Sequence, residues 1–207
     1  MKHLCARLLV IAVLGGLLAS AGCVVDNSDL VITDKVCVNI DEVQTDGSFS
    51  TFVVVDDFKD ALNKKLEQYG KTPKDVKSIH MVSGTFKSVK VEDHDWTVSA
   101  VINIGRQDDP NEDFTDGPAP LVEFEDQSLK ALKGQPADLD AAGVAVVNAA
   151  LESLLNGDDP RLVMIVSNES VDPTPTSDDP MAFTTTACVQ FQLVISGNVS
   201  NAGGKKR

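Results

Sequence analysis

Aromatic residues and histidine are scarce in this chain of 207 residues. Aromatic side chains make up 5% of it, with one Trp and one Tyr, and there are three histidines. Sugar-binding sites that stack their ligand on aromatic rings need more Trp and Tyr, so this composition argues against a carbohydrate site of that kind. Few histidines also leave few groups that exchange protons near neutral pH.

Basic residues are outnumbered by acidic ones. Lys and Arg total 18 against 31 Asp and Glu, which gives a formal net charge of −13. Nucleic-acid binding gains its affinity when Lys and Arg displace counterions from phosphates, so this balance disfavours a nucleic-acid partner. The same charge repels anionic lipid headgroups. We interpret the acidic excess mainly as a feature that keeps the protein soluble.

Motifs of known catalytic and nucleotide-binding sites are missing. The chain has no G-x-S-x-G, no H-E-x-x-H, no cysteine next to a histidine and neither of the glycine-rich phosphate loops. Nucleophilic catalysis needs a nucleophile activated by a base, and no such set stands out. We therefore predict that the protein is not an enzyme and has no cofactor and no metal.

Two histidines lie outside the N-terminal leader described below. His80 falls within a predicted strand, where a packed or surface role is the usual one. His94 stands between Asp93 and Asp95. A metal site is one interpretation of this group, but no second nitrogen or thiolate ligand follows at metal spacing, so a polar turn is favoured. A hydrolase would need one of these histidines beside a nucleophile.

The segment 107–120 is an acidic loop with oxygen ligands suited to calcium. From Asp109 it reads D-x-N-x-D, like the start of an EF-hand loop. Phe114 then stands where the turn needs Gly, and Pro120 stands where the closing Glu belongs. A solvated loop is favoured, with calcium binding as the alternative.

The first 22 residues have the layout of an export signal. Lys2 and Arg7 are followed by an apolar run over 8–19, which is too short to cross a bilayer as a stable helix. Three small residues then precede Cys23: Ser20, Ala21 and Gly22.

This junction resembles the lipobox of bacterial lipoproteins, although Ser20 stands where that family usually has Leu. The resemblance implies that residues 1–22 are removed, and that Cys23 is diacylated and becomes the N-terminus. Acyl chains would then hold the protein on the membrane. Val24 follows the cysteine rather than Asp, which in enteric-type lipoproteins implies the outer membrane. The resemblance covers the leader alone and implies nothing about activity.

The alternative is an ordinary secretory peptide that is cut after Ala21 or Gly22. Cys23 would then be an odd thiol, because export leaves only Cys37 and Cys188 besides it. If Cys23 carries lipid, the other two form a pair in an oxidising compartment. Two separate free thiols are the alternative to that pair.

The rest of the chain predicts a short tether, one domain and a tail. We expect residues 23–34 to form a lipidated tether, 35–197 a single domain and 198–207 a disordered polar tail. The domain is predicted to be α+β, an antiparallel β-sheet or sandwich of about seven strands with two amphipathic helices packed on it.

Hydrophobic periodicity places these elements. The first helix begins at Asp56 or Asp57, with Phe58, Leu62, Leu66 and Tyr69 on one stripe, and the second covers 140–155. Strands are predicted in this order: 35–40, 51–55, 76–82, 85–91, 96–104, 121–124, 162–166 and 183–195. Residues 76–91 and 96–104 are expected to pair as an antiparallel hairpin, 162–166 to be a central strand and 167–181 to be a loop.

Cys37 and Cys188 occupy equivalent places, each on the polar face of a strand whose other face is apolar. If the first and last strands are neighbours, the two sulfurs bridge on the exposed side of the sheet. On the chain-entropy model such a bridge stabilises the fold by up to ~5 kcal/mol.

The features together favour a non-catalytic structural or binding module at the cell envelope. Its expected partners are the membrane, reached through the lipid on Cys23, and an envelope protein. The alternative is an extracytoplasmic carrier or sensor that holds an apolar small molecule in a pocket between helix and sheet. A large buried cavity would favour the carrier.

Overall fold

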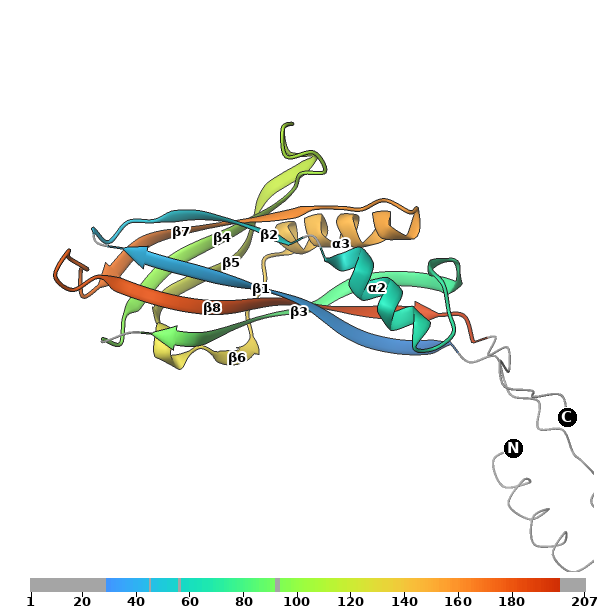
Figure 1. The fold of residues 1–207 in the computed structure, drawn as a ribbon, viewed down its shortest axis with the longest axis horizontal. Coiled ribbons are helices and arrows are strands. Elements are labelled where there is room, and N and C mark those ends of the chain that lie inside the picture. Colours follow the sequence, from blue (N-terminus) through green and yellow to red (C-terminus); the bar gives the residue numbers. More distant parts are fainter. Residues whose placement is uncertain (1–28, 45, 56, 92–93, 198–207) are drawn as a thin grey trace, which may run out of the picture.

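The described part of the chain folds into two facing antiparallel sheets and two helices. This computed structural model describes residues 29–44, 46–55, 57–91 and 94–197. Eight strands divide into two four-stranded sheets, which face each other in Figure 1 and pack their inner sides into one core. The predicted α+β class and the sandwich arrangement are confirmed.

Sheet A has the strand order β1-β8-β3-β6. Its strands are β1 (Leu30–Gln44), β8 (Met181–Ile195), β3 (Val76–Val91) and β6 (Lys133–Pro136). Along β8 every second residue is buried, as the apolar alternation predicts. The first and last strands of the chain are therefore direct neighbours, with Leu30 paired to Ile195 and Gln44 to Met181.

Sheet B has the order β2-β7-β4-β5. Its strands are β2 (Ser50–Val55), β7 (Leu162–Asp172), β4 (Thr97–Arg106) and β5 (Asp116–Ser128). In β4, Val98, Ala100, Ile102 and Ile104 face the core and are buried, as predicted. β7 lies inside the sheet, which confirms a central strand at 162–166.

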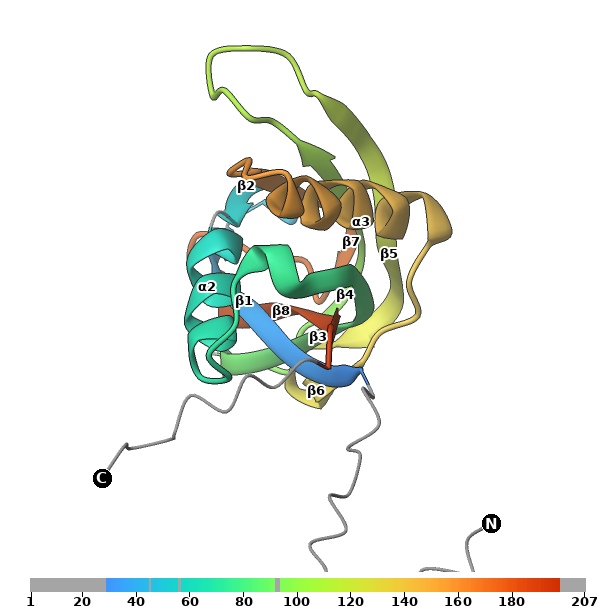
Figure 2. The same cartoon turned by 90° about the vertical axis from the view of Figure 1, so that its right-hand side faces the viewer.

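Both helices lie toward the end of the sandwich at which the described chain begins and ends (Figures 1 and 2). Helix α2 (Phe58–Glu67) buries Phe58, Leu62 and Leu66. Tyr69 lies beyond its last residue and is 45% exposed, so its place on the apolar stripe was predicted wrongly. The side chain of Asp57 stands at the N-cap without a capping hydrogen bond, and Asp56 lies outside the described residues.

Helix α3 (Ala141–Leu155) packs between the sheets, against β3, β4 and β5. At its start the carboxylate of Asp140 accepts a hydrogen bond from the backbone N–H of Ala142 at 2.7 Å, which satisfies one of the unpaired donors of the first turn. Gly143 lets the helix approach β5, because a Cβ there would lie 2.4 Å from the carbonyl oxygen of Pro120. Two 3-10 turns, η1 (Pro73–Asp75) and η2 (Leu129–Ala131), complete the fold.

The expected hairpin between 76–91 and 96–104 is wrong. β3 pairs with β8 and β6 in sheet A, whereas β4 pairs with β7 and β5 in sheet B. The connection between β3 and β4 therefore crosses from one sheet to the other. The alternation of apolar and polar residues predicted which side chains face the core. Because both sheets share that core, the alternation did not identify which strand pairs with which.

Several boundaries also differ from the prediction. β1 begins at Leu30, so residues 30–34 belong to the sheet and not to a tether that ends at 34. Ile32 explains the extension, because it is 5% exposed and adds a further rung to the core. β7 continues to Asp172, so the expected loop begins later. β5 covers 13 residues and not the four of 121–124, while β6 was not predicted.

Candidate functional site

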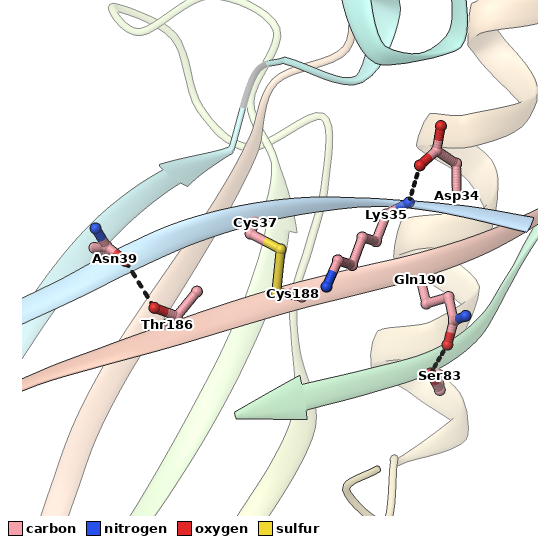
Figure 3. Close-up of a disulfide and its surroundings, with 8 residues drawn as sticks. All are labelled: Asp34, Lys35, Cys37, Asn39, Ser83, Thr186, Cys188 and Gln190. Carbon is pink, nitrogen blue, oxygen red and sulfur yellow. Dashed lines mark hydrogen bonds between the residues drawn. A yellow bond between two sulfur atoms is a disulfide. The ribbon is translucent and has the colours of Figure 1, made fainter. Parts of the chain in front are cut away.

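Cys37 and Cys188 form a disulfide on the outer face of sheet A. The register of β1 and β8 sets the two residues directly opposite each other, with their Cα atoms 4.0 Å apart. Such a separation is closer to that of a non-hydrogen-bonded pair, in which the side chains approach most nearly. Figure 3 shows the bridge lying across the two strands. The predicted pairing of these cysteines is confirmed.

Polar side chains surround the disulfide in rows that follow the strand register. On one side, the hydroxyl of Thr186 donates to the amide oxygen of Asn39 at 2.9 Å. On the other, the hydroxyl of Ser83 donates to the amide oxygen of Gln190 at 2.7 Å (Figure 3). These bonds cross between neighbouring strands, so they hold the side chains of the face in fixed positions.

The strands of sheet A carry more basic than acidic residues, in contrast to the whole chain. Their basic residues are Lys35, Lys77, Lys87, Lys90 and Lys133, and their acidic residues are Asp34, Asp41 and Glu42. β8, in the middle of the face, has no charged residue. The site is therefore a hydrogen-bonding surface of mostly neutral groups, in which Asp41 accepts a hydrogen bond from Thr184 and the lysines outnumber the carboxylates.

The two histidines of the domain do not meet on this face. The imidazole Nε2 of His94 lies 2.7 Å from a carboxylate oxygen of Asp179, and its ring packs edge-on against that of Trp96 at 5.5 Å. This contact joins the turn before β4 to the loop before β8. His80 lies on β3, paired with Gln192. Among the described residues, no three His, Cys, Asp or Glu side chains are grouped as metal ligands.

Several carboxylates of the acidic loop already bind groups of the protein itself. Arg106, with 13% of its side chain exposed, lies 2.8 Å from Asp108 and within 4.0 Å of Asp116 and Asp158. The hydrogen bond with Asp108 raises the pKa of the guanidinium. Asp109 accepts hydrogen bonds from the backbone and side chain of Asn111. The carboxylates at this end of β4 are thus arranged around an arginine.

The core contains a small apolar cavity of about 50 Å³. It lies between the two sheets, not between helix and sheet. Its lining includes Ala100, Phe124 and Phe183, together with Thr185. The hydroxyl of Thr185 is buried and has no hydrogen-bond partner in the described part of the chain. The cavity is small beside the roughly 300–1,000 Å³ of typical ligand pockets.

Cys23, residues 1–22 and the tail 198–207 lie outside the described residues, so the predicted lipid anchor stays a prediction. Neither described helix is long and apolar enough to span a bilayer. The chain matches no protein-family model and no curated protein sequence.

Proposed function

We propose that the protein is an exported bacterial lipoprotein, held at the cell envelope by acyl chains on Cys23, and that its domain is a non-catalytic binding or structural module. The observation that carries this proposal is the Cys37–Cys188 disulfide. Structural disulfides form and persist outside the reducing cytoplasm. The bridge therefore agrees with the export that the leader 1–22 predicts, and it leaves Cys23 without a partner among the exported cysteines.

The position of the disulfide suits an anchored domain. The tether joins the domain at β1, which is an edge strand of sheet A. β1 pairs with β8 along its whole length, and the bridge lies near the middle of that ladder. Any pull on the anchor reaches β1 first, and the disulfide stops the separation of β1 from β8 at Cys37, so the part of the strand after Cys37 stays paired. The covalent link between β1 and β8 therefore suits a domain that is anchored through its N-terminus.

The filled interior supports a binding or structural role over the carrier alternative. A drug-sized ligand needs about 300 Å³ or more, whereas the apolar cavity measures about 50 Å³. Helix α3 fills the space between the sheets with Val147, Ala150, Leu151 and Leu154, each at most 3% exposed. Recognition would therefore take place on the outer surfaces of the sheets.

Phase separation in a mild detergent tests the anchor. We expect the wild-type protein to incorporate labelled fatty acid and to partition into the detergent phase, and Cys23→Ser to incorporate none, because the acceptor thiol is lost. Cys5→Ser is the matched control, since Cys5 belongs to the leader, and it should behave like wild type. If Cys23→Ser still incorporates the label, acyl chains on Cys23 do not hold the protein.

The outer-membrane location has its own test in an enteric host. Val24→Asp is expected to keep the lipoprotein in the inner membrane, and Val24→Ala is expected not to. Density-gradient separation of the two membranes measures the distribution. Equal distribution of wild type and Val24→Asp would contradict sorting by this residue.

A further inference from the structure

The outer face of sheet B carries a contiguous apolar patch that does not belong to the core. Six residues form it, here called the outer patch: Phe52, Val54, Val101, Phe114, Val163 and Ile165. None of them belongs to the core cluster or to the side chains that pack against it. The most exposed is Phe52, at 66%, in a chain with few aromatic residues.

The strand register shows that these residues are neighbours. Phe52 pairs with Ile165, and Val54 pairs with Val163. Val163 in turn lies opposite Gly105 of β4. The ring of Phe114 covers that glycine so closely that a Cβ there would lie 2.6 Å from it. On β4, Asn103 lies opposite Ile165, and Val101 lies opposite Ser167, so Val101 is only a diagonal neighbour of Ile165. The patch is therefore continuous over β2 and β7, and it reaches β4 through Phe114 above Gly105.

The side chain of Val163 is buried on the outer face of sheet B, apart from the core between the two sheets. It is 3% exposed, yet it lies outside the core cluster. Both helices bury their apolar residues in the core between the sheets, so neither of the two described helices covers the outer patch. Of the six residues only Phe52 is exposed, while Val54, Val101, Phe114 and Ile165 are half-buried. Apolar surface that is left uncovered in one place on a soluble domain marks an interaction site more often than scattered residues do.

The charged residues of sheet B indicate which kind of partner would bind the outer patch. The strands of sheet B carry one basic residue, Arg106, which three carboxylates already surround. Their acidic residues are Asp116, Glu123, Glu125, Asp126, Glu169 and Asp172. Glu123 lies directly opposite Val101 in the register. Two copies placed face to face would bring these carboxylates together, which disfavours self-association.

We propose that the outer patch docks a protein partner whose apolar side chains are flanked by Lys or Arg. Phe52 supplies the most exposed contact, and the carboxylates of sheet B supply the charged rim. Exposed aromatic anchors of this kind carry a large share of binding energy, and rim charges set the rate and salt dependence of association. The proposal extends the binding role proposed above by naming its surface and the chemistry of its partner.

A model peptide tests this proposal without the lipid anchor. The full chain with Cys23→Ser, which has no acceptor for lipid, is titrated with a fluorescent peptide of alternating Leu and Lys, and binding is measured by anisotropy. We expect saturable binding that weakens as salt rises, and binding of a Leu–Glu peptide at least about tenfold weaker. Because lipid is absent, failure here leaves the anchor proposal intact.

Phe52→Ser should weaken binding by about tenfold, the loss of a strong hot spot. Val89→Ser is the matched control, because Val89 is 64% exposed but lies on β3 of sheet A, and it should leave the affinity unchanged. Circular dichroism checks that both variants are folded. The proposal would be overturned if Phe52→Ser binds with unchanged affinity, if the two peptides bind equally, or if the Leu–Lys peptide does not bind. A dimer that depends on Phe52 in sedimentation would also overturn it.

Discussion

Cys37 lies opposite Cys188 across the β1–β8 ladder, and their disulfide joins residues 151 positions apart in the sequence. The bridge connects the strand that follows the expected anchor to the strand that ends the domain. Almost the whole described domain is enclosed in the loop that it closes.

Removal of this bridge should cost much of the stability of the domain. The double variant Cys37→Ser/Cys188→Ser is expected to lose about 2–5 kcal/mol of unfolding free energy, because a long loop is no longer closed in the unfolded chain. Chemical denaturation measures the loss. Reductant should lower the stability of wild type by a similar amount and leave the double variant unchanged. Insensitivity of wild type to reductant would contradict the account.

Gly143→Ala should destabilise the protein, although Ala is the better helix former by about 1 kcal/mol. A Cβ at this position would lie 2.6 Å from the Cα of Leu121 as well as 2.4 Å from the carbonyl oxygen of Pro120. Backbone cannot yield as a flexible side chain can, so α3 must shift, at a cost of about 1–3 kcal/mol. The exposed helix position Ala145 provides the control, since Ala145→Gly should lose only the propensity difference. A more stable Gly143→Ala protein would show that α3 does not pack this closely on β5.

Thr185→Val should stabilise the domain. The hydroxyl of Thr185 is buried beside the cavity without a hydrogen-bond partner among the described residues, and its replacement removes a desolvation cost of about 1–3 kcal/mol. Thr186→Val, one residue along β8, removes the hydrogen bond to Asn39 instead and should destabilise the domain by about 0.5–1.5 kcal/mol. Thermal unfolding of both variants measures the difference. A loss of stability in Thr185→Val would mean that this hydroxyl is satisfied in solution.

Asp75 makes a pH-dependent contribution to the stability of the fold. The backbone N–H and then the hydroxyl of Thr72 donate to its carboxylate, at 2.8 and 2.9 Å, and hold its pKa below the ordinary value of 3.8. The lowered pKa stabilises the fold above about pH 3.8, and this contribution disappears as the pH falls through the folded-state pKa. NMR titration of the Asp75 carboxyl in wild type and in Thr72→Val checks this. The variant should show a higher pKa, and an unchanged value would contradict the role of the hydroxyl.

The sequence was a good guide to which residues face the core and a poor guide to which strands pair. Alternation along 183–195 predicts the buried side of β8 because one face of that strand is apolar and the other polar. β2 gives no such contrast, since Phe52 and Val54 are as apolar as Val53 and Val55. Only the packing in the folded domain shows that the first two point away from the core.

The candidate site was predicted in the same uneven way. Cys37 and Cys188 could be paired from the sequence because each stands on the polar face of an end strand and no other partner remains after export. The outer patch could not be predicted, because it combines two residues each from β2 and β7 with one each from β4 and the acidic loop. Phe114, noted in the sequence as the residue that breaks the calcium-loop pattern, proves to cover Gly105.

The intact mass of the protein purified from membranes, with and without reduction, tests the central claim most directly. We expect a chain that begins at Cys23, carries the mass of a diacylglyceryl group or of three acyl chains, and gains two protons on reduction of the Cys37–Cys188 bridge. An unmodified chain that begins at Gly22 or Cys23 would contradict it, because the protein would then be freely secreted and not tethered.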